Sequence, residues 1–183
     1  MKNVFKILSI ILLLSSFSFG AKISGINIPE TLKNGLILNG AGIRSKFFFD
    51  LYVGGLYLKE KSNNDLHVIN SDEPMAITLH ITSSMISSKK MSDATIEGFE
   101  NSTKNQIEPI KDKIDKFISV FKEEIKDGDI YAFIYSSKEG TKIFKNNKLI
   151  TTIKGLEFKK ALFGIWLCEK PAQESLKKEM LGL

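Results

Sequence analysis

The sequence contains few of the residues that most often carry catalytic or metal chemistry. Its 183 residues include one cysteine, two histidines and one tryptophan. Cys168 has no partner for an intramolecular disulfide, so the fold must be stabilised by packing. His67 and His80 lie far apart without neighbouring ligand residues, whereas a zinc site takes three or four convergent ligands. We therefore expect neither a metal ion nor a cofactor.

Arginine is almost absent although the chain is basic. The formal net charge is +5, and lysine supplies all but one of the 26 strong cations, the exception being Arg44. The lysines are spread along the chain between Asp and Glu residues, which is typical of a solvated surface. A nucleic-acid interface needs clustered basic residues, often with aromatics between them, and the sequence has no such cluster. Nucleic acid is therefore not expected as a partner.

The sequence also lacks the short motifs of common enzymes. It has no nucleophile elbow, no glycine loop that would bind phosphate, and no arrangement of serine, histidine and acid that suggests a triad. Any function must therefore be inferred from the pattern of apolar residues and from the few polar residues placed among them.

The longest apolar run lies at the N-terminus, where residues 7–19 follow Lys2 and Lys6 and lead to Ser18-Phe19-Gly20. A charged start, a short apolar stretch and small residues before a cleavage point are typical of a secretory signal peptide. The run is shorter than the roughly 20 residues that cross a bilayer. We predict a signal peptide over 1–20 and one domain over 21–183, exported to the periplasm or secreted, without stable membrane insertion after cleavage.

The hydrophobic pattern of the remaining chain predicts strands at both ends and helices between them. Such an order is typical of an α+β domain with a mainly antiparallel sheet. Strands are expected at 22–28, 36–44, 47–58, 75–82, 130–136, 141–145 and 149–153. Helices are expected at 88–102, 106–125, 157–167 and 173–181, with a loop or one helical turn at 63–70.

The single arginine follows two glycines. In an extended strand Gly40, Gly42 and Arg44 share one face, continuing from Leu38. The missing side chains predict a shallow floor with the guanidinium at its end. The next strand, 47–58, is apolar on both faces, which indicates that it is covered on both. Together these features predict an apolar cleft with one fixed positive charge.

A carboxylate fits such a cleft. The planar guanidinium donates two parallel hydrogen bonds to a carboxylate and loses less on desolvation than an ammonium does. The sequence leaves a structural role open as well, because Arg44 could pair with Asp50 or another acid, or lie on the surface. Which face of the neighbouring strand lines the cleft is also left open.

Several segments together resemble the bacterial chalcone isomerase-like family. They are "NGAGIRSKFFFDLYVGGLYL", "GDIYAFIY", "GTKIF" and "FKKALFGIWL", and the resemblance runs from Lys22 to Leu183. Its most specific parts are the G-x-G-x-R segment ending at Arg44, the Y-V-G-G-L-Y-L run and the G-I-W-L run. The resemblance implies an open-faced β-sandwich in which a helical layer covers a large antiparallel sheet, with the ligand cleft between the two.

The resemblance implies two roles for the arginine. In the plant enzymes of this fold, the residue matching Arg44 stabilises the phenolate during closure of a chalcone to a flavanone, and in related plant fatty-acid-binding proteins it holds the lipid carboxylate. The other catalytic positions are replaced here: the strand threonine matches Tyr52, the helix tyrosine Met91 and the helix asparagine Gly98. One arginine binds an anion, but acid-base or electrostatic catalysis needs several converging donors. The resemblance therefore favours binding over catalysis.

We therefore predict a monomeric, non-catalytic binding protein for a small amphipathic carboxylate such as a fatty acid. The residues expected at the ligand are Arg44, Tyr52, Phe48, Leu56, Gly40 and Gly42. One alternative is an isomerase or intramolecular lyase acting on a phenolic or enone substrate. Another is an envelope interaction protein whose cleft is filled by side chains.

Overall fold

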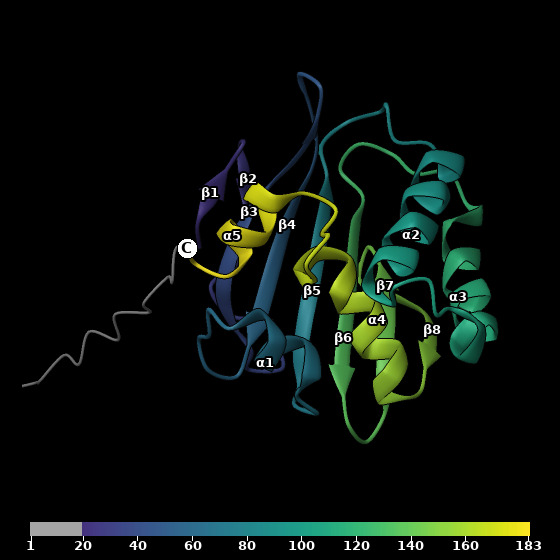
Figure 1. Ribbon diagram of the computed structural model, residues 1–183. Coiled ribbons are helices and arrows are strands. Elements are labelled where there is room, and N and C mark those ends of the chain that lie inside the picture. The colour runs from purple at the N-terminus through teal and green to yellow at the C-terminus, as the bar shows by residue number, and fades with distance from the viewer. Residues whose placement is uncertain (1–19) are drawn as a thin grey trace, which may run out of the picture.

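The computed structural model describes residues 20–183 (Figure 1), so all but the last residue of the predicted signal peptide lies outside the described part. Its centre is a six-stranded antiparallel sheet in which each strand pairs with its neighbour along the chain. The strands are β3 (Ile37–Lys46), β4 (Phe49–Leu58), β5 (Met75–Ile81), β6 (Ile130–Ser136), β7 (Gly140–Lys145) and β8 (Lys148–Ile153). This arrangement confirms the predicted α+β class.

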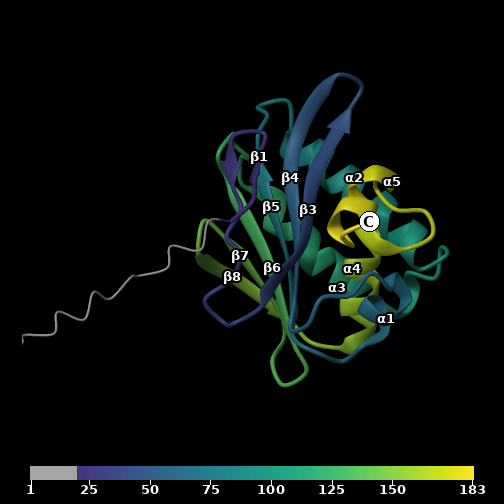
Figure 2. The ribbon, with the colours of Figure 1, turned by 90° about the vertical axis from the view of Figure 1, so that its left-hand side faces the viewer.

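The helices form a layer on one face of the sheet (Figure 2). They are α1 (Asp65–Asn70), α2 (Ser88–Ser102), α3 (Lys111–Ile118), α4 (Leu156–Leu167) and α5 (Glu174–Met180). The main core lies between this layer and the sheet, where Phe99, Phe117, Phe133 and Phe158 form a chain of aromatic contacts. No helix within residues 20–183 is long and apolar enough to cross a membrane.

The N-terminal segment covers part of the opposite face of the sheet (Figure 2). The strand predicted over 22–28 is interrupted by a turn with positive φ at Ser24 and Gly25, which divides it into β1 (Lys22–Ile23) and β2 (Ile26–Asn27). Ile28 then packs with Val53 in a smaller second core. Both faces of β4 are thus covered, as its apolar sequence indicates.

The prediction of one helix over 106–125 is wrong. Two single turns of 3₁₀ helix, η1 (Glu108–Ile110) and η2 (Ser119–Lys122), flank α3. Pro109 lies in η1, and its missing N–H and fixed φ favour the start of a helix and disfavour its interior. The apolar stripe still reaches the core, since Ile114, Phe117 and Phe121 are buried.

A β-bulge in β3 changes the face on which the glycines lie. Leu38 and Gly40 pair with successive residues of β4, so Asn39 is an extra residue in the ladder. Leu38 therefore packs against the second core, whereas Gly40 and Gly42 face α5. The expectation that Leu38 continues the glycine face is wrong because side chains alternate only where the ladder is regular.

Candidate functional site

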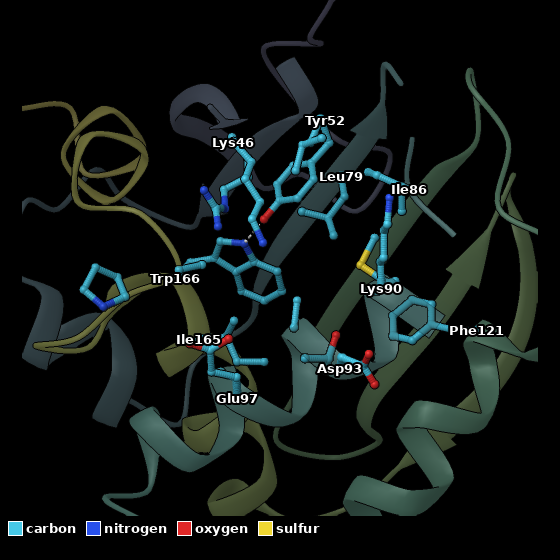
Figure 3. A pocket seen from close by; sticks show the side chains of 18 of the residues that line it. Lys46, Tyr52, Leu79, Ile86, Lys90, Asp93, Glu97, Phe121, Ile165 and Trp166 are labelled. Atoms are coloured by element: carbon cyan, nitrogen blue, oxygen red, sulfur yellow. Dashed lines mark hydrogen bonds between the residues drawn. The ribbon is translucent and has the colours of Figure 1, made fainter. Parts of the chain in front are cut away.

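A cavity of about 520 Å³ lies between the sheet and the helical layer (Figure 3). This volume is within the range of about 300–1,000 Å³ that is common for small-molecule sites. The apolar part of its wall includes Leu79, Met91, Phe121, Phe133, Ile165 and Trp166. The sheet, α2, η2 and α4 all contribute, so the cavity occupies the position predicted for the cleft.

Arg44 lines this cavity from β3. Its Nη1 donates hydrogen bonds to the backbone oxygen of Ser45 at 2.6 Å and to Oε1 of Gln173 at 2.9 Å. No carboxylate within residues 20–183 forms an ion pair with the guanidinium. Asp50, the acid considered from the sequence, instead accepts hydrogen bonds from the hydroxyls of Ser45 and Ser24. The alternative role of Arg44, a structural salt bridge with Asp50, is therefore not observed in the described residues.

The Nη2 and Nε groups of Arg44 remain available. A guanidinium carries five N–H donors, of which Nη1 has two. Within residues 20–183 the three others form no hydrogen bond with a carboxylate or backbone oxygen, and the polar group beside them is the phenol of Tyr52. Nη2 and Nε donate in parallel along one edge of the guanidinium, which is the arrangement that a carboxylate accepts.

Gln173 fixes Arg44 in this orientation, and sequence reasoning missed it. Its Oε1 also accepts from the backbone N–H of Ser45 at 3.0 Å, while its Nε2 donates to the oxygen of Ile43 at 3.2 Å. Gln173 immediately precedes α5, so one amide ties this helix to β3 on both sides of the arginine. A glutamine more than a hundred residues from Arg44 gives no sequence signal for this role.

Tyr52 lies directly opposite Arg44 in the β3–β4 ladder, so both side chains are on the same face of the sheet. Its hydroxyl accepts a hydrogen bond of 3.0 Å from Nε1 of Trp166. Burial raises the pKa of the Tyr52 phenol, and the Trp166 hydrogen bond and the charge of Arg44 partly offset this. The phenol is therefore protonated at neutral pH, and its O–H can donate to an acceptor in the cavity.

Charged side chains surround the mouth of the cavity (Figure 3). Lys46 comes from the end of β3, and Lys90, Asp93 and Glu97 come from exposed positions of α2. Asp93 is paired with Lys89 at 2.6 Å. The polar rim and the apolar wall together suit an amphipathic molecule.

Four of the six expected ligand residues lie elsewhere in the structure: Phe48, Leu56, Gly40 and Gly42. Phe48 is 99 % exposed in the turn between β3 and β4, because the strand expected from residue 47 begins only at Phe49. Leu56 is fully buried in the main core and does not line the cavity. Tyr52 and Arg44 alone of the six expected residues line it.

Gly40 and Gly42 make room for a helix, which corrects the expected ligand floor. A Cβ at Gly40 would lie 2.1 Å from the backbone oxygen of Glu179, and one at Gly42 would lie 1.7 Å from its Oε2. At Gly40 the obstacle is the backbone of α5, and at Gly42 it is the side chain of Glu179, whose Cβ would also lie at 2.7 Å. The missing side chains therefore allow α5 to pack directly on β3. The expected close approach is real, but α5 is the element that approaches.

Met91 and Gly98, which the family resemblance alone aligns with catalytic positions, both line the cavity from α2. Met91 presents a thioether, and Gly98 presents no side chain. A Cβ at Gly98 would lie 2.7 Å from Cγ2 of Ile165, so the contact between α2 and α4 leaves no room for an asparagine. These two positions therefore bring no polar side chain to the cavity. Thr95 is a further polar residue of α2 in the wall.

A sheet covered by a helical layer, with a cavity between the two, is the arrangement of the chalcone isomerase fold. Residues 20–182 match the family described as chalcone isomerase-like, and the chain belongs to this family. The crystal structure of a fatty-acid binding protein from Arabidopsis thaliana is similar, with a TM-score of 0.70 and 17% sequence identity. The similarity covers 86% of this chain and 92% of the plant chain. No curated protein matches the sequence.

The described residues offer no cluster for a metal ion. Within 20–183, no three His, Cys, Asp or Glu side chains gather closely enough to bind one. His80 is partly buried, and burial lowers the pKa of its imidazole. The chemistry of the site thus depends on the guanidinium of Arg44, the phenol of Tyr52 and the apolar wall.

Proposed function

We propose that this protein binds a small amphipathic carboxylate such as a fatty acid and catalyses no reaction on it. One observation carries the proposal: a guanidinium without an acidic partner in the described chain lines a largely apolar cavity of about 520 Å³. The similarity to a fatty-acid binding protein of the same fold supports the ligand class.

In the proposed complex, the carboxylate accepts from the Nη2–Nε edge of Arg44 and from the hydroxyl of Tyr52, which lies beside the guanidinium. Hydrogen bonds to a charged group contribute about 1.5–3 kcal/mol each when they replace water in a protein site. The tail lies along Met91, Phe121 and Ile165, and burial contributes about 0.8 kcal/mol per methylene. Affinity should therefore rise with chain length until the cavity is filled.

The proposal includes export and a monomeric state. Export rests on the sequence pattern of residues 1–20, and the monomeric state is part of the same proposal. The intact mass of the protein isolated from its host compartment tests export. A chain beginning at Ala21 supports export, and a retained N-terminus contradicts it. The molar mass in solution, measured by light scattering, tests the monomeric state.

Native mass spectrometry of the same preparation, followed by extraction and identification of any bound lipid, tests the ligand directly. Titration with palmitate and with its methyl ester then isolates the contribution of the carboxylate to the binding affinity. We expect the wild-type protein to prefer the acid by at least about tenfold, which corresponds to about 1.4 kcal/mol.

Arg44→Lys keeps the charge but loses the paired donors. We expect it to weaken palmitate binding about tenfold while the ester affinity and the melting temperature change little. Lys148→Gln, at the distant β7–β8 hairpin, is the matched control and should bind like the wild type. A large loss of stability in Arg44→Lys with unchanged palmitate binding would assign the arginine a structural role instead.

A second candidate is an isomerase or lyase acting on a phenolic or enone substrate. It is favoured by Tyr52, since the phenol is a second polar group beside Arg44. An absorbance assay over a panel of chalcones and enones distinguishes the two. Turnover that Tyr52→Phe abolishes would establish catalysis, and its absence with tight acid binding supports the carrier. The cavity volume argues against the third candidate, an interaction protein with a filled cleft.

A further inference from the structure

The β3–β4 hairpin ends in three consecutive phenylalanines that neither core uses. Phe47 is 87 % exposed, Phe48 99 % and Phe49 52 %. The two strands extend well beyond their neighbours, so the tip stands out from the sheet (Figure 2). A contiguous exposed apolar group of this kind commonly marks an interaction site for a protein or a membrane.

The conformation of the turn does not explain the phenylalanines. Phe47 has a φ of 58°, in the left-handed region, which is unfavourable for a bulky side chain. The β7–β8 hairpin uses Asn146 and Asn147 for the same conformation, with φ of 51° and 64°. Asparagine tolerates this region well. The chain thus has a phenylalanine at a position of the turn whose backbone conformation is unfavourable for that residue.

Two unpaired lysines accompany the tip. Lys46 precedes the phenylalanines, and Lys90 lies across the mouth of the cavity on α2 (Figure 3). Neither forms an ion pair with any residue of the described chain, whereas the adjacent Lys89 pairs with Asp93. Lys90 donates only to the backbone oxygen of Met85, whose side chain is itself 44 % exposed.

The size of the tip favours a membrane over a protein partner. Three phenylalanines at these exposures offer on the order of 500 Å² of apolar surface. A stable protein interface needs about 800 Å² from each partner. Insertion into a bilayer has no such minimum area, because the burial of each ring contributes its own favourable free energy. The neighbouring lysines can remain among the lipid phosphates.

We propose that the tip of the β3–β4 hairpin is a membrane-docking element for a bilayer with anionic headgroups. Phe47, Phe48 and Phe49 enter the acyl region, and Lys46 and Lys90 lie at the level of the headgroups. Phe47 and Lys46 also line the cavity, so docking turns its mouth toward the membrane. The docking itself does not depend on the ligand proposed for Arg44.

Sedimentation with vesicles tests the proposal. The full chain is expressed and purified in the form that the cell produces, with whatever N-terminal processing occurs. It is then mixed with vesicles of phosphatidylcholine, or of phosphatidylcholine and phosphatidylglycerol in equal amounts. Intact mass confirms that all variants share one N-terminus. We expect Phe48→Ser to lower partitioning into the mixed vesicles by about tenfold, as expected for loss of one buried ring. Lys46→Gln should reduce the preference for anionic vesicles.

Leu66→Ser is the matched control. Leu66 is 67 % exposed on α1, which lies at the end of the molecule opposite the hairpin tip (Figure 1). It should bind vesicles like the wild type. Arg44→Lys should also keep its vesicle binding, which separates this proposal from the proposed ligand.

Bromine-labelled lipids locate the contact directly. The indole introduced by Phe48→Trp should be quenched by them, and that of Leu66→Trp should not, with the buried Trp166 as a common background. Unchanged partitioning of Phe48→Ser, equal losses in both serine variants, or an unquenched Phe48→Trp would each overturn the proposal. A mass that doubles without lipid and falls to the monomer in Phe48→Ser would assign the tip to a second copy of the chain.

Discussion

The indole Nε1 of Trp166 donates a 3.0 Å hydrogen bond to the phenolic oxygen of Tyr52, which lies 114 positions earlier in the chain. Both side chains are buried, and the bond links α4 to β4 at the wall of the cavity. Since the indole can only donate, the Tyr52 hydroxyl keeps its own hydrogen to donate to another acceptor. Trp166 is thus a positioning residue for the donor proposed to act with Arg44.

Trp166→Phe should lower the free energy of unfolding by about 1–3 kcal/mol, because it removes a buried hydrogen bond and part of a packed ring. The pKa of Tyr52 should rise further, since the hydrogen bond from Trp166 lowers it. Urea unfolding measures the first effect, and the ultraviolet absorbance of tyrosinate at alkaline pH the second. Tyr52→Phe and the double variant complete the cycle. Strictly additive losses of stability would mean that the bond contributes nothing.

Gly40→Ala should be strongly destabilising, because its Cβ would lie 2.1 Å from the backbone oxygen of Glu179. We expect a loss of about 2 kcal/mol or more, as for other overpacked sites. Displacing α5 would also release Gln173, so binding through Arg44 should weaken together with stability. Thermal unfolding and palmitate titration measure the two effects.

Gly54→Ala is the control for this prediction. Its Cβ would meet Cδ1 of Leu176 at 3.5 Å, an ordinary van der Waals contact between β4 and α5. It should therefore change stability by no more than about 0.5 kcal/mol. Similar melting temperatures for Gly40→Ala and Gly54→Ala would contradict the close packing of α5 on β3.

The regular elements were predictable because their residues alternate or repeat with the period of the structure they form. The helix expected at 88–102 and the strand expected at 130–136 have the same bounds as α2 and β6. Their buried faces follow directly from the apolar positions. Arg44 could be placed in the cleft from the alternation of its strand and the family resemblance. The sequence left open which face of the next strand lines the cleft, so Tyr52 could not be placed there with Phe48 and Leu56 excluded.

The rest depends on contacts that the local sequence does not contain. The bulge at Asn39 is held by its Nδ2, which donates to the oxygens of Ser62 and Met180 at 2.9 and 2.8 Å. Phe48 was misplaced because a two-residue turn of phenylalanines carries none of the usual turn residues. Gln173 could not be recognised, since its role depends on contacts with Ile43, Arg44 and Ser45, which are distant in the sequence.

Lys159 was equally invisible in the sequence, and it is fully buried in α4. Its Nζ donates to the backbone oxygens of Val68, Ile69 and Ser71, where α1 ends. Burial, with a smaller contribution from the charge of Lys160, lowers the pKa of this amine to about 7. The lysine therefore ties α1 to α4 at a marked cost of desolvation.

The lowered pKa makes the stability of the fold depend on pH. As the pH rises from about 7 toward the ordinary value of 10.5, an amine with this lowered pKa releases its proton in the folded chain before the unfolded chain does. The free energy of unfolding should therefore rise with pH across this window, by at most about 1.4 kcal/mol per unit, and this gain should be lost as the pH falls to 7. Urea unfolding at several pH values measures the slope.

Lys159→Met isolates the contribution of this amine, because every other titrating group stays the same. The variant should lose stability at all pH values, since three carbonyls lose their donor, and its slope between pH 7 and 9 should be smaller than that of the wild type. The three carbonyls and the rings of Tyr135 and Phe163, at 5.6 and 5.5 Å from Nζ, favour the ammonium and reduce the slope. Equal slopes in the two proteins would mean that these contacts outweigh desolvation and that Lys159 remains charged in the folded state.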